Sequence, residues 1–171
     1  MSTDPVLRGE RVVLRPARAA DVEVLVGILQ RPEVARWWGR WDLERGRREL
    51  LGAGDERCLV VLLDDVVAGL VQYVEEDEHD YRHAAIDIFL GPEWHGRGLG
   101  ADAVRTLARH LIDGRGHHRL TIDPAAENAR AIASYKRVGF RPVGIMRQYE
   151  RSADGNWRDA LLMDLLAHQL R

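Results

Sequence analysis

The stretch that decides the fold reads GPEWHGRGLGA, residues 91–101. It lies between an apolar run that ends at Leu90 and a segment in which apolar residues recur at helical spacing. A strand, a glycine-rich loop and a helix are therefore expected in this order. Such a loop presents free backbone N–H groups at a helix N-terminus, where the helix dipole favours an anion such as a pyrophosphate. A glycine-rich turn without a ligand is the alternative interpretation.

A dinucleotide-binding Rossmann motif competes for the same residues. Gly96, Gly98 and Ala101 satisfy the pattern G-x-G-x-x-G/A, and Asp123 lies near the position expected for a ribose-binding acid. The context disfavours this motif, because residues 91–95 separate the strand from the first glycine. In addition, only about 70 residues remain after the loop to complete a parallel sheet.

Outward from the loop, apolar periodicity and turn residues predict the other elements. Strands are expected at 11–15, 58–63, 66–74, 81–90, 118–122, 140–149 and 157–166, and helices at 22–29, 33–51, 99–111 and 127–138. This order predicts a mixed α/β fold, and the length of 171 residues predicts a single domain over 1–171.

Composition excludes several classes of protein. With 25 basic and 27 acidic side chains, the formal net charge of -2 gives no positive field for nucleic acid or for an anionic membrane. The single cysteine, Cys58, lies in an apolar run typical of a buried strand. The N-terminal residues lack an apolar signal, so we expect a cytoplasmic protein. Its expected oligomeric state is a monomer or a homodimer. The seven histidines show no zinc-ligand spacing, and no metal is expected.

Two motifs in order resemble the GNAT superfamily of acyl-CoA-dependent N-acetyltransferases. Gly98 and Gly100 match the signature [Q/R]-x-x-G-x-G/A, whose first position holds His95 here. The segment 128–140, from Asn128 to Phe140, matches the helix that borders the CoA thiol in that family. The resemblance implies a mostly antiparallel central sheet flanked by helices, with strands splayed at the acyl-CoA site, and acetyl-CoA as cofactor.

The resemblance also implies which residues bind the cofactor. These are Phe89, Leu90, His95, Gly96, Arg97, Gly98, Leu99, Gly100, Ala101, Asn128, Ala131 and Tyr135. Because His95 replaces Gln or Arg, one side-chain contact to CoA differs from the family pattern, while the backbone of residues 96–101 keeps it.

A narrower resemblance is to the bacterial aminoglycoside 6'-N-acetyltransferases. It rests on residues 37–39, 69–73, 86–91 and 121–124. It implies acetylation of the 6'-amine of an aminoglycoside by direct attack in a ternary complex, and hence antibiotic resistance. A branch that acylates siderophore precursors shares parts of this pattern. The alternatives are therefore another amine, such as a siderophore precursor, a polyamine or a protein N-terminus, and a non-catalytic CoA- or antibiotic-binding module.

The chemistry of amine acetylation selects two catalytic candidates. Asp87 lies in the middle of an apolar strand, where an acid is costly unless it is paired or faces a cleft, so it is the expected carboxylate at the amine. The resemblance makes Tyr135 the expected proton donor to the thiolate. Pairing of Asp87 with an arginine, and core packing of Tyr135, are the structural alternatives.

The expected amine-binding residues are aromatic, polar and acidic. They are Trp37, Trp38, Gln72, Tyr73, Glu75, Glu76, Asp87 and Asp123. Glu75 and Glu76 open a run, residues 75–80, that contains five carboxylates and is expected to steer a cationic substrate. A solvated turn is the other interpretation of this run.

Overall fold

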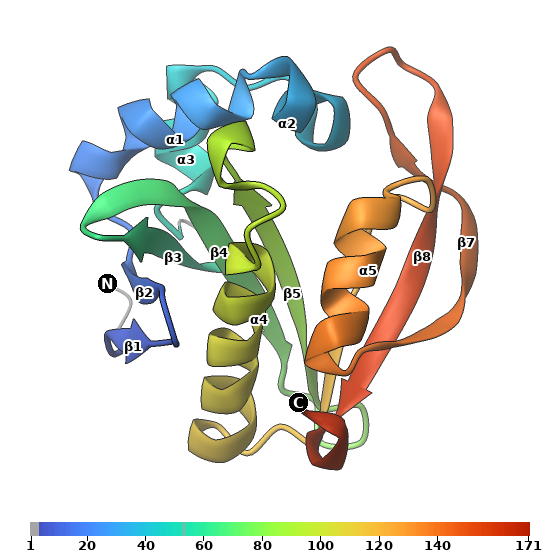
Figure 1. Ribbon diagram of the computed structural model, residues 1–171. Helices are drawn as coiled ribbons and strands as arrows, with labels where there is room; N and C mark the ends of the chain where they lie inside the picture. The colour runs from blue at the N-terminus through green and yellow to red at the C-terminus, as the bar shows by residue number, and fades with distance from the viewer. Residues whose placement is uncertain (1–3, 53) are drawn as a thin grey trace.

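A central sheet organises the part of the chain that the computed structural model describes, residues 4–52 and 54–171. Its eight strands are β1 (Leu7–Arg8), β2 (Val13–Pro16), β3 (Arg57–Leu63), β4 (Val66–Glu76), β5 (His83–Leu90), β6 (Arg119–Ile122), β7 (Arg141–Arg151) and β8 (Trp157–Leu166). They are ordered β1-β2-β3-β4-β5-β6-β8-β7 across the sheet. The predicted mixed α/β fold is confirmed (Figure 1).

The sheet divides where β5 meets β6. Within the described residues this is the one parallel pair, and it extends only from Ala84 and Ala85 to Leu120 and Thr121. All other neighbouring strands are antiparallel. Beyond Ala85, β5 continues to Leu90 without β6 beside it, and β5 and β8 move apart toward the top of Figure 1. The splayed strands expected from the resemblance are therefore present.

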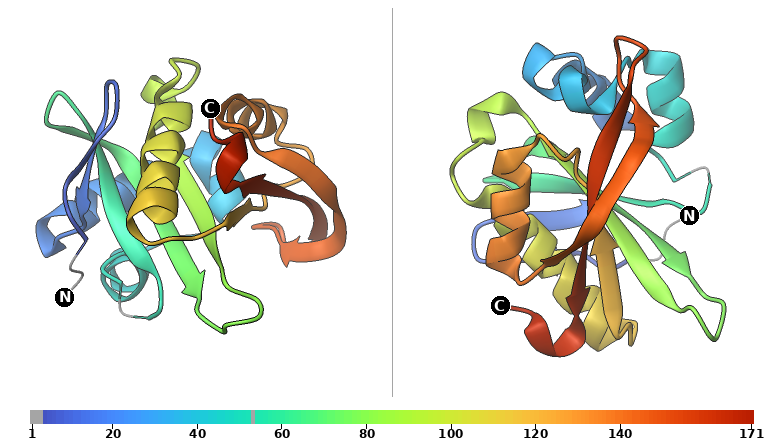
Figure 2. Two further views of the ribbon diagram at one scale, coloured as in Figure 1. Left: turned by 90° about the horizontal axis from the view of Figure 1, so that it is seen from below. Right: turned by 90° about the vertical axis from the view of Figure 1, so that its right-hand side faces the viewer.

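Helices cover both faces of the sheet (Figures 1 and 2). They are α1 (Val22–Leu29), α2 (Pro32–Trp38), α3 (Leu43–Glu49), α4 (Leu99–Arg109) and α5 (Ala129–Val138), with short helical turns at Ala19–Asp21, Pro92–Trp94, His110–Gly114 and Ala167–Gln169. Strand residues alternate between two apolar clusters, because successive side chains point to opposite faces. Leu59 and Val61 pack with α4 and α5, whereas Val60 and Leu62 pack with α1–α3.

The single helix predicted over 33–51 is wrong, because two helices occupy that segment. Pro32 is the first residue of α2, a position where its missing N–H costs nothing. Gly39 ends α2 with φ of 76°. Asp42 then begins α3 by accepting a hydrogen bond from the backbone N–H of Arg45 at 2.8 Å. These end signals override the continuous helical periodicity.

Over residues 4–52 and 54–171, none of the helices combines the length and the apolar character needed to cross a membrane.

A buried carboxylate fixes α4 to the N-terminal strands. Asp102 of α4 is 5% exposed and accepts hydrogen bonds from the backbone N–H groups of Glu10, Arg11 and Val12 at 3.0, 2.8 and 3.0 Å. The guanidinium of Arg11 also donates to the carbonyl of Arg97 at 2.8 Å. The turn between β1 and β2 therefore holds both α4 and the glycine-rich loop that precedes it.

We expect Asp102→Ala to lower the free energy of unfolding by about 3 kcal/mol, since it leaves three N–H groups without their charged acceptor. Asp102→Asn keeps one oxygen acceptor, so its loss should be smaller. Urea denaturation monitored by circular dichroism measures both. A change below about 1 kcal/mol in Asp102→Ala would show that the carboxylate does not anchor α4.

Candidate active site

The glycine-rich loop carries an open N-terminal end of α4. Gly96 and Gly98 have φ of 71° and 78°, a region that favours glycine, and Gly98 caps the helix. A Cβ placed on either glycine would meet no atom within 4 Å. The predicted loop-to-helix transition at Leu99 is confirmed, and the space in front of the loop is free for an anion.

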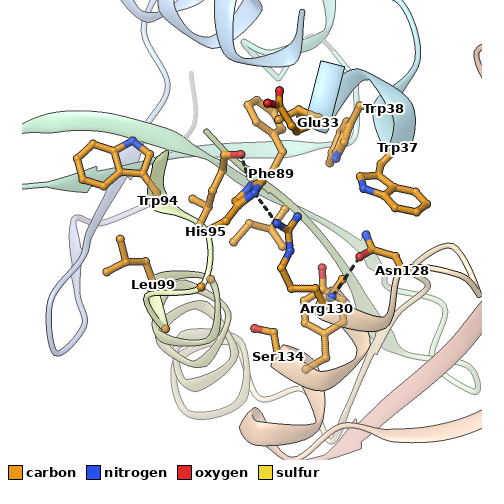
Figure 3. Close-up of a pocket in the computed structure, with 18 of the residues that line it drawn as sticks. Glu33, Trp37, Trp38, Phe89, Trp94, His95, Leu99, Asn128, Arg130 and Ser134 are labelled. Carbon is orange, nitrogen blue, oxygen red and sulfur yellow. Dashed lines mark hydrogen bonds between the residues drawn. The ribbon is translucent and has the colours of Figure 1, made fainter. Parts of the chain in front are cut away.

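A cavity lies between this loop, the end of β5, helix α2 and helix α5 (Figure 3). Two cationic side chains of α5, Arg130 and Arg137, are part of its wall. Ten of the twelve expected cofactor-binding residues line it: Phe89, Leu90, His95, Gly96, Gly98, Leu99, Gly100, Asn128, Ala131 and Tyr135. Glycine amides at a helix N-terminus beside two arginines fit a ligand that carries phosphates.

Arg97 and Ala101 do not line this cavity. The guanidinium of Arg97 lies 5.1 Å from the ring centre of Trp94, and Ala101 is buried in the core. Their side chains therefore point elsewhere, although their backbone belongs to the same loop.

His95 has a defined hydrogen-bonding state. Its Nε2 lies 2.8 Å from the carbonyl oxygen of Leu90, and Nη1 of Arg130 lies 2.5 Å from its Nδ1 (Figure 3). Because a guanidinium only donates, Nδ1 must accept and Nε2–H must donate to Leu90. Burial lowers the pKa of His95, and the charge of Arg130 acts in the same direction. The imidazole is thus neutral and orients Arg130 at the cavity.

A second, acidic cavity adjoins the first, which is called the basic cavity because Arg130 and Arg137 line it. It contains the carboxylates of Asp87, Asp123 and Glu150. Five residues belong to the walls of both cavities: Trp37, Trp38, Ile88, Asn128 and Tyr135. A ligand in the basic cavity and a ligand in the acidic one would therefore meet at Tyr135 and Asn128.

The acidic cavity changes the proton affinity of Asp87. Burial in the cleft, and then the charges of Asp123 and Glu150, raise the pKa of Asp87 to about 7. A hydrogen bond from the N–H of Ile88 at 3.0 Å opposes this increase. Water still reaches the side chain, which is exposed within the cleft. A carboxyl group of this kind exchanges a proton near neutral pH.

Tyr135 keeps its proton. It is 6% exposed, and burial together with the charges of Asp87 and Asp123 raises its pKa above the ordinary value. Its ring lies 6.3 Å from that of Phe140 in an edge-on arrangement. At neutral pH its phenol can donate a proton but does not begin as a phenolate.

Sequence reasoning missed three polar residues of the acidic cavity: Tyr149, Glu150 and Arg158. The hydrogen bond that Tyr149 donates to Asp123 raises the pKa of Tyr149 to about 12. Glu150 accepts from Nε of Arg158 at 2.7 Å. Burial raises the pKa of Asp123, although the hydrogen bond from Tyr149 opposes this increase. The predicted strand 140–149 stops one residue before Glu150, and no motif marks these positions.

Arg158 connects the acidic cavity to α2. Besides Glu150, it donates to the carbonyl oxygens of Arg36 and Trp37 at 2.6 and 2.5 Å. Its guanidinium also lies 5.4 Å from the ring centre of Trp37. Trp38 packs edge-on against Phe89 at 5.0 Å. These contacts hold the two tryptophans over both cavities.

Of the expected amine-binding residues, Trp37, Trp38, Asp87 and Asp123 come together in the acidic cavity. Gln72 lies opposite Asp87 in the β4–β5 register, on the same face of the sheet. Its amide oxygen is 3.8 Å from Sγ of Cys58, and it does not line the cavity.

The structure does not bring Tyr73, Glu75 or Glu76 to the acidic cavity. Tyr73 is buried on the other face and donates to Asp4 at 2.7 Å. Although burial opposes it, hydrogen bonds from Arg115 and His117 hold the pKa of Glu75 at about 2. Glu76 accepts from the N–H of Glu78 at 2.9 Å.

Glu75 and Glu76 thus end β4, where Glu75 is paired with Arg115 and Glu76 accepts from the turn that follows. The negative charge of the cleft comes from Asp87, Asp123 and Glu150 instead.

No group of three or more His, Cys, Asp or Glu side chains converges as a metal site among the residues that the structure describes.

Comparisons with known proteins agree with this arrangement. Residues 11–141 match the model of the acetyltransferase (GNAT) domain. Spermidine N(1)-acetyltransferase of Escherichia coli K12 is 30% identical over 165 residues, which cover 92% of this chain and 87% of that protein. A [ribosomal protein bS18]-alanine N-acetyltransferase of Salmonella typhimurium is 33% identical over 138 residues, which cover 73% of this chain and 87% of that protein. The structure of AAC(6')-Ib with paromomycin and acetyl-CoA superposes with a TM-score of 0.79 at 25% identity. The superposition covers 94% of this chain and 96% of that chain.

Proposed function

Because this chain belongs to the GNAT acetyltransferase family and is an acetyl-CoA-dependent N-acetyltransferase, we propose that its acceptor is a primary amine on a polycationic small molecule. The preferred acceptor in this proposal is the 6'-amine of an aminoglycoside. The observation that carries it is the acidic cavity, where Asp87, Asp123 and Glu150 gather beside two tryptophans.

In this proposal the basic cavity holds acetyl-CoA, which supplies the acetyl group as a thioester. The backbone amides around Gly96 and Gly98 bind its pyrophosphate at the N-terminus of α4. Arg130 and Arg137 add positive charge for its phosphates. Tyr135 stands at the junction with the acidic cavity, where the reacting groups meet.

Asp87 acts at the amine. A protonated amine is not a nucleophile, so one proton must leave before it attacks. With a pKa of about 7, Asp87 accepts that proton more readily than an ordinary carboxylate does. Asp123 and Glu150 provide the negative field that holds further ammonium groups of the acceptor.

A linear polyamine is the second candidate acceptor. The acidic cavity suits any compound with several ammonium groups, and a spermidine acetyltransferase is among the relatives. Trp37 and Trp38 favour the aminoglycoside, because their ring faces and N–H groups suit the mixed polar and apolar surface of sugar rings. A protein N-terminus carries one ammonium group, so it gains less from the negative charge of the acidic cavity.

A thiol-release assay with acetyl-CoA tests the acceptor. We expect aminoglycosides with a 6'-amine to give kcat/KM about tenfold or more above spermidine and above an alanine-initiated peptide, which corresponds to about 1.4 kcal/mol. An aminoglycoside with a 6'-hydroxyl is the matched control and should not react. Faster turnover of spermidine or of the peptide would contradict the aminoglycoside assignment.

A pH profile tests Asp87. Below about pH 7 the carboxyl is protonated, so kcat/KM should rise as pH increases through this value. Asp87→Asn should abolish this limb and lower the rate at pH 8 by about 100-fold. Asp123→Asn removes a neighbouring negative charge, so it should move the limb to lower pH. An Asp87→Asn enzyme with the wild-type profile would exclude Asp87 from proton transfer.

Tyr135→Phe tests the proton donor. Phenylalanine keeps the packing against Phe140 and removes only the hydroxyl. We expect kcat to fall by about 10- to 100-fold, while the dissociation constant of CoA, measured by calorimetry, stays within about twofold. An unchanged kcat would remove Tyr135 from the mechanism.

A further inference from the structure

The hairpin of β7 and β8 contains a large bulge beside the acidic cavity. Met146 pairs with Ala160, and the next pair is Glu150 with Arg158. Three β7 residues, 147–149, therefore lie opposite one β8 residue, Asp159. Bulges of this kind turn side chains away from regular alternation and are frequent next to functional sites.

The carboxylate of Asp159 holds this bulge. Its Oδ1 accepts a hydrogen bond from the backbone N–H of Gln148 at 2.8 Å. Gln148 has φ of 48°, a left-handed conformation that is unfavourable for a residue with a Cβ. The surrounding contacts must therefore maintain it, and the bond to Asp159 is one that acts directly on this residue.

The bulge determines which side chains reach the acidic cavity. Consecutive residues of a regular strand point to opposite faces, yet Tyr149 and Glu150 both line this cavity. Their partners complete the wall: Tyr149 donates to Asp123, and Glu150 accepts from Arg158. A regular β7 would direct one of the two away from the cleft.

The same part of β8 also holds the segment that follows Asp123. The carbonyl of Asp159 accepts from the N–H of Ala126 at 2.9 Å, and the N–H of Leu161 donates to the carbonyl of Pro124 at 2.8 Å. Ala125 and Ala160 form a bridge between the two segments. Both ends of the Tyr149–Asp123 hydrogen bond are thus fixed relative to Asp159.

We propose that Asp159 is a positioning residue that determines acceptor specificity, by fixing the bulge that brings Tyr149 and Glu150 into the acidic cavity. It acts through these residues and does not line the cavity itself. This inference rests on the proposed acceptor site but not on the identity of the amine, since any acceptor in this cavity would contact the same wall.

Three variants test the proposal with the amine that the wild-type enzyme acetylates best. Asp159→Ala removes the acceptor of the Gln148 N–H, and we expect KM for the amine to rise by about tenfold, equivalent to about 1.4 kcal/mol. KM for acetyl-CoA should stay within about twofold. Asp159→Asn keeps an Oδ1 acceptor in the same place and should restore the wild-type values. Tyr149→Phe keeps the bulge and should reproduce part of the increase.

A spectroscopic measurement makes the test independent of any acceptor. The hydrogen bond to Asp123 raises the pKa of Tyr149 to about 12. Ultraviolet titration should show this tyrosine ionising at lower pH in Asp159→Ala but not in Asp159→Asn, with Tyr149→Phe identifying its signal.

Each outcome separates the inference from the proposed function. Turnover of no polycationic amine by the wild type would overturn the proposed function, and the tyrosine titration would still decide the role of Asp159. An Asp159→Ala protein with unchanged amine KM and unchanged titration would overturn the inference. Equal increases of KM for amine and for acetyl-CoA, or no rescue by Asp159→Asn, would overturn it as well, because they indicate a general loss of structure.

Discussion

β5 and β6 pair only through Ala84–Ala85 and Leu120–Thr121, and both cavities depend on the point where this pairing stops. Beyond it, β5 exposes the edge that carries Asp87 and ends at Leu90. The two parts of the sheet separate, and α5 occupies the space between them on one side (Figure 1). Had the parallel pairing continued, β6 would cover this edge, since neighbouring strands lie about 4.8 Å apart. The interruption of a hydrogen-bonded ladder thus creates the site.

Contacts distant from the reacting groups keep the separated strands in place. Asp102 fixes α4 and its loop to the turn before β2, and Arg158 fixes the carbonyl end of α2 to the C-terminal hairpin. Both use a charged side chain to satisfy backbone groups that a helix or a turn leaves unpaired. These two charge-assisted connections therefore determine where the glycine loop, Trp37 and Trp38 lie. Neither connection depends on a local sequence motif.

The sequence predicted the features that local chemistry determines. Gly98 and the helical pattern after it define the loop and the start of α4, and the arrangement of turns defines most strands. Glu75 shows the opposite case, because its partner Arg115 is 40 residues away, and only the folded chain reveals that this carboxylate is already paired. Glu150 was missed because it enters the cleft through a register shift between β7 and β8. Periodicity describes regular strands, so it does not detect a bulge that redirects two consecutive side chains.

The two cavities have opposite charge although the whole chain is nearly balanced at -2. Arg130 and Arg137 line one, and Asp87, Asp123 and Glu150 line the other. The residues shared by both walls carry no fixed charge, and the raised pKa of Tyr135 keeps its phenol neutral. An anionic ligand and a cationic ligand are thus drawn to opposite sides of one neutral boundary. Asp87 lies on the acidic side of this boundary, and because its pKa is raised to about 7, its charge changes near neutral pH.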